Sequence, residues 1–409
     1  MKLAKTIQKC QFSNKKDLRL IISLGYLPPV NEFIKINSIK SQSVFFPTDL
    51  VYSSSSKLVQ LSTIVNKSIV FPKSYPYTSS TTKILRENFS ELSKECNKLI
   101  NLNSTDLIVD IGSNDGNLLS NFKRIRRLGV TPENIGKLAI KKGIPTLLNY
   151  FDKKTANLIK KKYGQAKIIT ATNVFAHIDN IKELMGNVLK ILKNDGVFIT
   201  ESHYLMPLIQ DLQYDTIYHE HLRYYSLTSL KNIFNKFNLE IIHAKEIPTH
   251  GGSIRVYVSR KNKYKKSKLI NKILSKEKKL LSWQKFLNFR DKVVDSKLQL
   301  LSLLRKIKQK KKTIYAVGAP SRASTLVNYT GITKEIIDCI CEVSNSYKVG
   351  HYMPGTNIPV VSEKIIFKKK PEYLLLLSWH ISKELINNLK KKGYKGKFII
   401  PLPKPRIVN

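Results

Sequence analysis

Apolar and polar positions alternate in blocks typical of strands and helices through the middle of the chain. Leu107 to Val109 form a short apolar run that ends at Asp110; a loop with Gly112 and Gly116 and a periodic apolar stretch from Leu118 to Phe122 follow. This order of strand, glycine loop and helix predicts the ligand-binding turn of a doubly wound α/β domain. Glycines in such a loop let backbone N–H groups approach a ligand closely.

The spacing of this loop indicates the kind of ligand. Its Asp-x-Gly-x-x-x-Gly pattern differs from the Gly-x-Gly-x-x-Gly of phosphate-binding loops, and no Gly-Lys-Ser/Thr follows. The pattern fits a loop for S-adenosylmethionine (SAM) better than a loop for a dinucleotide or for ATP. A glycine turn in an unrelated α/β protein has the same pattern, so other residues have to decide between the two.

The alternation of strands and helices continues on both sides of the loop. Over residues 81–99, five apolar side chains fall on one helical face, namely Ile84, Leu85, Phe89, Leu92 and Cys96. Helices are also predicted over 136–142, 181–192 and 227–237, strands over 167–172 and 196–200, and a turn at 194–196. Alternating strands and helices predict a parallel sheet.

The flanking segments have different patterns and predict two further domains. Residues 1–80 resemble a set of short strands and turns, and residues 260–312 contain no Gly or Pro and predict one or two long amphipathic helices. A second strand, loop and helix begin at Thr313, with later strands over 336–341, 373–377 and 397–400. We therefore expect domains at 1–80, 81–245 and 246–409.

Composition and charge limit the classes of partner. The chain has 409 residues, 42% of them hydrophobic, and a formal net charge of +42. No apolar run reaches the ~18 residues of a membrane helix, and the first residues lack a signal-peptide core, so a cytoplasmic protein without a membrane partner is expected. The lysines are spread along the chain and do not interleave with aromatic residues, so a nucleic-acid partner is not expected either. A positive field would still attract an anionic substrate.

The densest group of titratable side chains lies in residues 214–225, YDTIYHEHLRYY. His219 and His221 are two positions apart, which is not the spacing of a helical HExxH zinc site. In an extended segment both histidines would face one side and Glu220 the other. A loop that presents His221 as a general base, oriented or charge-stabilised by Glu220, is the sharper hypothesis. Histidines on the surface or satisfied in packing are the alternative.

Two other segments carry candidate site residues. His177 follows a predicted strand, where ligands of open α/β sheets gather, although a lone histidine there is as often structural. In THGGSIRVY, His250 precedes Gly251 and Gly252, and Arg255 follows. The two glycines allow close approach of a ligand, or they form a hairpin bend.

At these residues the chain resembles a known family, the three-domain SAM-dependent C-methyltransferases that act on nucleotide-linked 4-ketosugars. The resemblance covers nearly the whole chain and rests on the order and separation of eight short motifs. These are LGYLPPVNEF (24–33), LVQL (58–61), YPYTSS (75–80), DIGSNDGNLL (110–119), YHEH (218–221), PTHGGSIRVY (248–257), GAPSRASTLVNYTGI (318–332) and PGTNIPV (354–360).

The resemblance implies an α/β protein with a central class I SAM-methyltransferase domain of Rossmann-like fold. A small N-terminal domain of zinc-binding type would precede it, and a Rossmann-like C-terminal domain that helps to hold the nucleotide sugar would follow. His221 would remove a proton from the carbon next to the ketone. The residues implied to support catalysis are Tyr218, Glu220, His177 and Tyr75 or Tyr77. Those implied to bind SAM are Asp110, Gly112, Asn114, Gly116, Thr131 and Asn173. Those implied to bind the substrate are His250, Gly251, Gly252, Arg255 and Arg322.

Two positions depart from the family pattern. Cys10 matches the first zinc-binding cysteine, but Ser13, Ser53 and Ser56 stand in place of the other three. Serine is a poor zinc ligand beside thiolate, so no zinc is expected. Thr131 stands where relatives carry an acidic residue for the SAM ribose; either Glu133 substitutes or SAM binds more weakly.

The resulting hypothesis is a SAM-dependent enzyme, monomeric or homodimeric, that methylates a carbon of a nucleotide-linked ketosugar for polysaccharide or secondary-metabolite synthesis. An O- or N-methyltransferase of a sugar-type substrate is the first alternative. A binding protein that has lost catalysis is the second, favoured by the missing cysteines and by Thr131.

Overall fold

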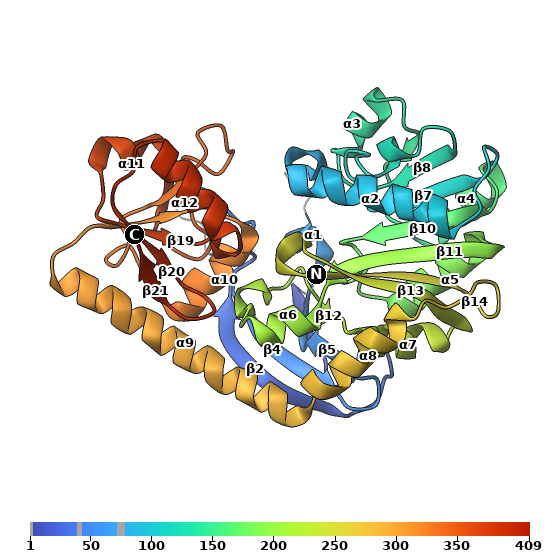
Figure 1. The fold of residues 1–409 in the computed structure, drawn as a ribbon, viewed down its shortest axis with the longest axis horizontal. Coiled ribbons are helices and arrows are strands. Elements are labelled where there is room, and N and C mark those ends of the chain that lie inside the picture. Colours follow the sequence, from blue (N-terminus) through green and yellow to red (C-terminus); the bar gives the residue numbers. More distant parts are fainter. Residues whose placement is uncertain (1–2, 39–42, 72–77) are drawn as a thin grey trace.

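The computed structural model describes residues 3–38, 43–71 and 78–409. Two α/β lobes lie side by side, and the N-terminal strands together with a long helix join them along one edge (Figure 1). One apolar cluster runs from the N-terminal strands through residues 205–224 and the long helix into the second lobe. This shared core fixes the lobes relative to each other and therefore fixes the space between them.

The N-terminal domain consists mainly of antiparallel strands that pair with segments of both lobes. Its elements are β1 (Ala4–Thr6), β2 (Leu18–Leu27), β3 (Ile34–Lys35), β4 (Phe46–Ser53), β5 (Leu58–Leu61), β6 (Thr63–Val65) and α1 (Lys67–Val70). Strands β2, β4 and β5 are joined at one edge by β12 (Arg223–Tyr224), which comes from the middle of the chain. The segment just before β12 is thereby anchored to the N-terminal sheet.

The middle lobe contains a sheet of seven strands. They are β7 (Leu107–Ile111), β8 (Arg126–Val130), β9 (Thr146–Leu147), β10 (Ala166–Thr172), β11 (Leu192–His203), β13 (Leu239–Ile247) and β14 (Ser253–Arg260), in the order β13-β14-β11-β10-β7-β8-β9. Strands β7 to β11 are parallel, and every residue of β7 and β10 is buried. The strand order reverses between β7 and β10, where open α/β sheets bind ligands beyond the carboxyl ends.

Four of the six helices of this lobe, α2, α3, α5 and α7, lie where the sequence predicts helices. They are α2 (Lys83–Leu99), α3 (Gly136–Lys141), α4 (Lys153–Lys162), α5 (Ile181–Ile191), α6 (Leu205–Gln210) and α7 (Leu227–Asn235). Ser226 and Ser229 form a capping box at the start of α7. In α2 the predicted apolar face is buried except at Ile84, which is 47% exposed because it lies one position before buried Leu85.

The second lobe contains an eight-stranded sheet. Its strands are β15 (Ile314–Val317), β16 (Ile340–Glu342), β17 (His351–Tyr352), β18 (Pro359–Ser362), β19 (Tyr373–Leu376), β20 (Lys397–Ile400) and β21 (Arg406–Val408), and the eighth is β3 from the N-terminal domain. Its helices are α10 (Ser321–Thr330), α11 (Lys364–Lys369) and α12 (Ser382–Lys391). Helices α8 (Leu269–Leu280) and α9 (Trp283–Gln309) connect the lobes, as the pattern over 260–312 predicted.

The structure corrects the helix predicted directly after the first glycine loop. Residues 118–122 form only a short 3-10 turn, η2 (Leu119–Asn121). Strand β8 begins at Arg126, which leaves little chain for a helix. The side chains of Ser120 and Asn121 also bind the carbonyl of Asn117, at 2.7 and 2.9 Å, and compete with helical hydrogen bonds.

Two element boundaries differ from prediction, and one predicted domain boundary falls inside a strand. The expected turn at 194–196 lies inside β11, where a register shift in the pairing with β10 accommodates it. Ile336 and Ile337 donate backbone hydrogen bonds to Thr333 in a turn, so the strand predicted from 336 begins at Ile340. The predicted domain boundary at 245/246 falls within β13, and the middle sheet continues to the end of β14.

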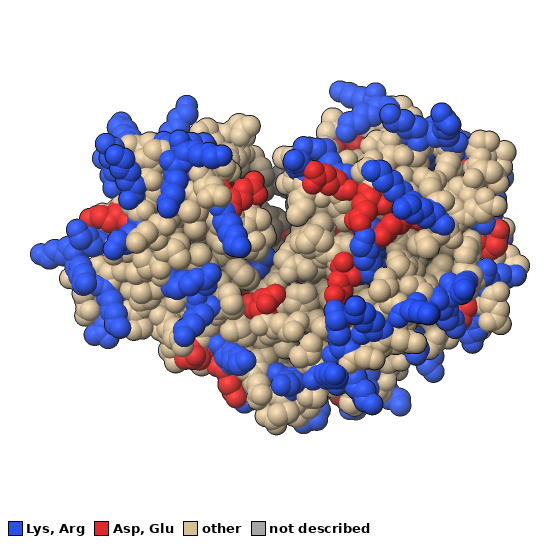
Figure 2. All heavy atoms as spheres, in the orientation of Figure 1, with Lys and Arg blue, Asp and Glu red and all other residues tan. Residues whose placement is uncertain are grey.

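Charge is distributed over both lobes. On the face drawn in Figure 2, lysine and arginine side chains are scattered over the two lobes, with acidic groups between them, and do not gather in one patch. Among the residues that the structure describes, no helix combines the length and the apolar character needed to cross a bilayer.

Candidate active site

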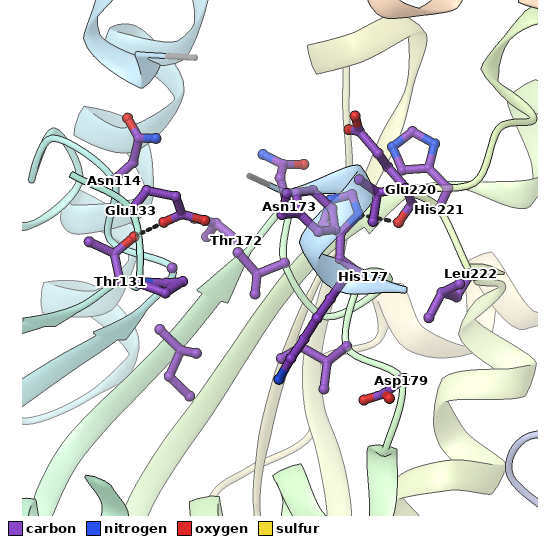
Figure 3. Close-up of a pocket in the computed structure, with 18 of the residues that line it drawn as sticks. Asn114, Thr131, Glu133, Thr172, Asn173, His177, Asp179, Glu220, His221 and Leu222 are labelled. Carbon is purple, nitrogen blue, oxygen red and sulfur yellow. Dashed lines mark hydrogen bonds between the residues drawn. The ribbon is translucent and has the colours of Figure 1, made fainter. Parts of the chain in front are cut away.

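A cavity of about 880 Å³ lies between the two lobes. The carboxyl ends of β7, β8 and β10 line one side of it, and residues 218–222 together with the start of α10 line the other (Figure 3). Eleven predicted site residues line this cavity: Asp110, Gly112, Asn114, Thr131, Asn173, His177, Tyr218, Glu220, His221, His250 and Arg322. Residues separated by more than two hundred positions therefore meet in one space.

The loops after β7 and β10 form the first side of the cavity. Gly112 has a φ of +73°, and a Cβ atom there would lie 2.3 Å from a methyl group of Val174 in the loop after β10. Asn114 and Asn173 have φ values of 51° and 56°, in the left-handed region that asparagine tolerates better than most residues. Strained backbone at both strand ends is typical of a ligand-binding site.

Asp110 is the residue before the last in β7 and lines this side of the cavity. It is 2% exposed and accepts a hydrogen bond of 2.6 Å from the Thr170 hydroxyl. Burial raises the pKa of Asp110 to about 7, against the opposing effect of the Thr170 bond. A cationic group nearby would stabilise the ionised form of this carboxyl group.

An acidic residue, Glu133, stands two positions after Thr131. The Thr131 hydroxyl donates a hydrogen bond to the carboxylate of Glu133, and both line the cavity. Figure 3 shows the pair on the same side as Asn114, across the cavity from Glu220 and His221. Both predicted outcomes of this departure, substitution by Glu133 and weaker SAM binding, stay predictions.

The YHEH loop forms the second side. His221 is 7% exposed, and its Nδ1–H donates to the carbonyl of Thr216 at 3.0 Å, since a carbonyl can only accept. Nδ1 therefore carries the proton and Nε2 carries the lone pair in the neutral ring. Burial, together with the neighbouring His177, lowers the pKa of His221 to about 3. The ring is neutral at physiological pH and available as a base.

Aromatic and imidazole rings surround this histidine. The ring centroid of Tyr218 lies 4.2 Å from that of His221, with His203 at 4.9 Å and His177 at 5.2 Å. Burial raises the pKa of Tyr218 well above its usual value, so its hydroxyl stays protonated and can donate. His250 lies 5.8 Å from His203 and extends the cluster.

The loop is held by contacts to all three domains. His177 donates from Nδ1 to the backbone carbonyl of Glu220. Asn31, between β2 and β3, donates to the Glu220 carboxylate at 2.6 Å and accepts from the hydroxyl of Ser321, the first residue of α10, at 3.3 Å. The position of Glu220 is therefore set by the N-terminal domain and by the second lobe together.

The structure separates the two histidines that an extended segment would place side by side. His221 N–H donates to the Tyr218 carbonyl at 3.0 Å, so residues 218–221 form a tight turn. His219 turns toward the N-terminal sheet, where its Nε2–H lies 3.2 Å from the Pro47 carbonyl and 3.1 Å from the Thr48 hydroxyl. His221 alone of the two joins the imidazole cluster described above.

The second lobe adds cationic groups at the start of α10. Arg322 forms a bidentate pair with Asp215, at 2.7 and 2.8 Å, which engages Nε and Nη2 and leaves Nη1 outside the pair. Trp379 also donates to Asp215, at 2.7 Å, and its ring lies under the guanidinium. Lys348 reaches the cavity from the loop after β16 and donates to the carbonyl of Ala319 at 2.6 Å.

Comparison with known proteins identifies all three parts of the chain. Residues 248–403 match the C-methyltransferase C-terminal domain, residues 82–244 a methyltransferase domain, and residues 10–71 a domain described as "Putative zinc binding domain". C-methyltransferase NovU of Streptomyces niveus is 28% identical over 417 aligned positions, which cover 100% of this chain and 98% of that protein. The chain is a SAM-dependent C-methyltransferase, and all three of its parts are similar to the domains of the three-domain C-methyltransferases.

Solved methyltransferase structures are similar to part of this C-methyltransferase. A SAM-dependent methyltransferase from Anabaena variabilis is 15% identical, with a TM-score of 0.33, covering 42% of this chain and 84% of that one. A second, from Clostridium acetobutylicum, is 17% identical with a TM-score of 0.34, covering 44% and 93%. The matched domains and the strand order confirm the predicted central methyltransferase fold between a small N-terminal domain and a C-terminal α/β domain.

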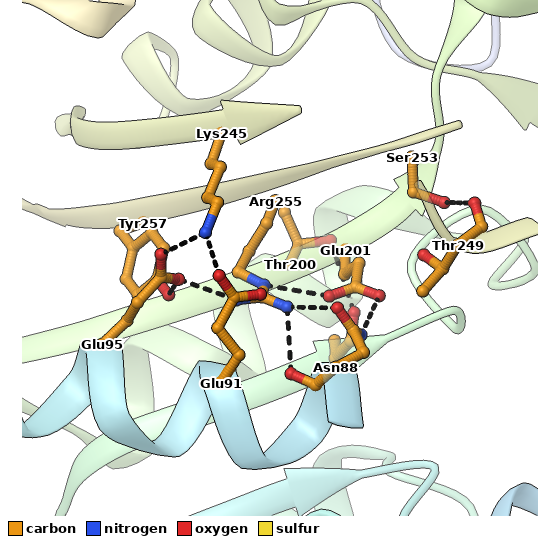
Figure 4. A network of polar contacts seen from close by, with 11 residues as sticks. Asn88, Glu91, Glu95, Thr200, Glu201, Lys245, Thr249, Ser253, Arg255 and Tyr257 are labelled. Atoms are coloured by element: carbon orange, nitrogen blue, oxygen red, sulfur yellow. Dashed lines mark hydrogen bonds and ion pairs between the residues drawn. The ribbon is translucent and has the colours of Figure 1, made fainter. Parts of the chain in front are cut away.

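Arg255, predicted to contact substrate, lies outside the cavity of the C-methyltransferase. It is fully buried on β14 and binds Glu201 at 3.0 Å, Glu95 at 2.7 Å and the Asn88 side chain at 2.6 Å (Figure 4). Asn88 and Glu95 come from α2, and Glu201 comes from β11. This network fastens α2 to the sheet, which corrects the predicted role of Arg255.

Three predicted glycines also lie outside the cavity. A Cβ atom at Gly116 would lie 2.9 Å from Ala139, and Cβ atoms at Gly251 and Gly252 would meet Gln213 and Pro207, each at 2.6 Å. These glycines allow close packing within turns, which corrects their assignment as ligand contacts. Their neighbours Asn114 and His250 do line the cavity.

The predicted tyrosines, Tyr75 and Tyr77, lie outside the described residues, and their roles stay predictions. The same motif continues into Ser79, whose hydroxyl donates to Asp115 at 2.6 Å and whose backbone N–H donates to the Asn114 side chain at 2.9 Å. The end of the YPYTSS segment is therefore fastened to the glycine loop.

Three cavity residues were missed from the sequence although a simple rule finds them. His203 is the last residue of β11, Lys348 follows β16 and His380 follows β19. All three occupy carboxyl ends of parallel strands, the same kind of position that singled out His177. Asn31 had no such signal, because it lies in a loop that only the tertiary fold brings to Glu220.

Acid will destabilise the C-methyltransferase through its buried histidines. Burial lowers the pKa of His219 to about 4. The unfolded chain then binds more protons than the folded chain between that value and the ordinary 6.5, so stability is lost as pH falls through this window. For His219 the slope reaches up to about 1.4 kcal/mol per pH unit.

The experiment is urea unfolding of the wild type and of His219→Gln at pH 7, 6 and 5. We expect the wild type to lose more stability than the variant on acidification. The comparison cancels the opposite effect of Asp110, whose raised pKa favours the folded state in acid. An equal loss of unfolding free energy with falling pH in the two proteins would contradict the assignment of a neutral buried His219.

Proposed function

We propose that this C-methyltransferase transfers a methyl group to the carbon next to the ketone of a nucleotide-linked ketosugar. One observation carries the proposal: a single cavity joins the strand ends of a methyltransferase sheet, a neutral buried histidine and a cationic helix start. These three parts suit a methyl donor, a carbon acid and an anionic nucleotide, respectively.

The residues on the first side of the cavity fit SAM. Asp110 has a carboxyl group that a cationic ligand would ionise, and Glu133 offers a carboxylate to ribose hydroxyls. The backbone of Asn114 and Asn173 frames the opening between β7 and β10. When bound, SAM supplies a methyl group on a sulfonium centre with a neutral thioether as leaving group, so the protein has to supply mainly position and a base.

His221 is the proposed base. Its Nε2 lone pair takes the proton from the carbon next to the ketone, and the electron pair of that C–H bond moves toward the ketone oxygen as an enolate. The bond from Nδ1–H to Thr216 holds the tautomer that leaves Nε2 unprotonated. The ring becomes cationic, and the nearby Glu220 carboxylate counters this charge.

The developing enolate oxygen needs hydrogen-bond donors. Tyr218 keeps its hydroxyl proton and packs against the base, so it suits this role. His177 does not suit it in the neutral form, because its Nδ1–H is already engaged by the Glu220 carbonyl. We therefore assign His177 to positioning the YHEH loop.

The start of α10 suits the phosphates of the nucleotide. Its N-terminal N–H groups and dipole favour an anion. Ser321, Arg322 and Lys348 line the cavity around this helix end. Burial lowers the pKa of Lys348, and a bound anion would restore the favourable environment of the ammonium group.

Incubation of the protein with SAM and a panel of nucleotide-linked ketosugars tests the proposal. We expect mass gain by one methyl group on a ketosugar, with an NMR shift typical of a methyl bound to carbon. A methyl on oxygen or nitrogen would establish the alternative methyltransferase. Absence of SAM binding at millimolar concentration would support a binding protein without catalysis.

Glu133→Gln is expected to weaken SAM binding. Loss of a charge-assisted hydrogen bond costs about 1.5–3 kcal/mol, which corresponds to a Kd higher by about 10- to 100-fold. Calorimetric titration of SAM measures the effect, and Glu335→Gln, at an exposed position of the second lobe, is the matched control. An unchanged Kd for Glu133→Gln would leave the ribose without its proposed acceptor.

A further inference from the structure

Two turns of the N-terminal domain face each other and have the same construction. In the first, the backbone N–H of Ser13 lies 3.4 Å from the Sγ of Cys10; in the second, the N–H of Ser56 lies 3.4 Å from the Oγ of Ser53. The residue after each turn has a left-handed φ, 59° at Asn14 and 58° at Lys57. In each turn the first and last residues are three positions apart, as in a Cys-x-x-Cys motif. Two such turns of one geometry are typical of a site that surrounds a metal with four side chains.

The four side chains at these positions converge through hydrogen bonds. Cys10 Sγ lies 3.2 Å from the Ser56 hydroxyl. Ser55 bridges the other two, since its hydroxyl donates to Ser13 at 3.1 Å and lies 3.3 Å from Ser53. The side chains that would hold a metal in a zinc-binding domain hold each other here.

A carboxylate organises the second turn. Asp17 accepts hydrogen bonds from the backbone N–H of Ser55 at 2.7 Å, from the Ser54 hydroxyl at 3.1 Å and from the Ser53 hydroxyl at 2.9 Å. These bonds outweigh partial burial and lower the pKa of Asp17. The turn over residues 53–56 is therefore held by hydrogen bonds to the Asp17 carboxylate, which lies on the neighbouring chain segment.

The donor set does not fit zinc. Structural zinc takes four thiolate or imidazole ligands, and one thiol with three neutral hydroxyl groups does not provide them. Among the described residues no group of three or more His, Cys, Asp or Glu side chains is arranged to hold a metal ion. The match of residues 10–71 to a zinc-binding domain therefore reflects the backbone and not these ligands.

We propose that an Asp17-centred hydrogen-bond network has taken the place of a zinc ion in this domain, while the backbone of both turns keeps the geometry to hold one. The inference is independent of the proposed methyl transfer. It predicts a metal-free wild type and a gain of metal binding when thiols are restored.

The test is the full-length variant Ser13→Cys/Ser53→Cys/Ser56→Cys beside the wild type, both purified without chelator. Mass spectrometry of metals is expected to find about one zinc per chain in the triple variant and none in the wild type. Titration with Co²⁺ should produce the thiolate charge-transfer absorbance only in the variant. One zinc bound by the wild type, or a folded variant that takes up no metal, would overturn the proposal.

A second measurement does not depend on the triple variant folding. The unfolding temperature of the wild type should be unchanged by EDTA and by added zinc, whereas Asp17→Ala should lower it through loss of the acceptor for Ser53, Ser54 and Ser55. Ser38→Ala, at an exposed position elsewhere in the domain, is the control. A wild type that EDTA destabilises, or Asp17→Ala with an unchanged unfolding temperature, would overturn the network as the substitute for a metal.

Discussion

His221→Gln should lower the rate of methyl transfer by about 10²- to 10⁴-fold, the usual contribution of a general base. Glutamine keeps the approximate size of the side chain and cannot take a proton from carbon. SAM binding should stay within about twofold of the wild type, because the strand ends that fit SAM lie across the cavity from His221 (Figure 3). Single-turnover kinetics and calorimetry measure the two quantities.

The chain contains a matched control two positions away. His219→Gln changes the same residue type in the same loop, but His219 is bound to Pro47 and Thr48 on the N-terminal sheet. We expect this variant to retain most of its turnover. Comparable losses in both variants would assign the effect to loop structure, and near-normal turnover in His221→Gln would remove His221 from the mechanism.

Arg255→Met should destabilise the middle lobe by about 3–5 kcal/mol, the cost of leaving a buried charge without its partner. Glu201 is fully buried and shares its carboxylate between Arg255 and Asn88. Burial already raises the pKa of Glu201, and loss of the guanidinium would raise it further. The free energy of unfolding by urea, followed through tryptophan fluorescence and circular dichroism, measures the effect.

The same variant distinguishes a structural arginine from a substrate-binding one. Arg255→Met/Glu201→Gln removes both charges and should recover part of the lost stability, while Lys245→Met, at a half-buried partner of Glu95, should cost about 0–1 kcal/mol. The KM for the proposed sugar substrate, measured on folded protein at low temperature, should be unchanged in Arg255→Met. A raised KM with normal stability would restore the sequence-based assignment.

Much of the fold follows from local patterns. The short apolar runs within β7 and β10 and the periodic face of α2 are short-range signals, and Ser226 caps its helix as its residue type predicts. The helix expected after Gly116 does not form, and the reason is also local, because β8 begins at Arg126 and leaves too few residues for a helix. What periodicity cannot show is pairing over distance, such as β3 joining the sheet of the second lobe.

The residues of the candidate site can also be divided into those with a local sequence signal and those that depend on distant contacts. His177, His221 and the glycine loop lie where strand ends and titratable groups can be recognised in sequence. Arg255 was misplaced because its neighbours Gly251 and Gly252 resemble a ligand loop, while its partners Glu95 and Asn88 lie on a helix far away in sequence. Asn31 was missed for the opposite reason, since no catalytic or ligand-binding motif was recognised next to it in the sequence.

The short strand β3 has a consequence for any attempt to divide the protein. It pairs with β17 and forms one edge of the sheet of the second lobe, although it belongs to the first forty residues. A fragment that starts after α9 would leave the N–H and C=O groups of β17 open, and open strand edges recruit other chains. Such a fragment should self-associate unless a peptide spanning residues 28–37 is supplied in trans.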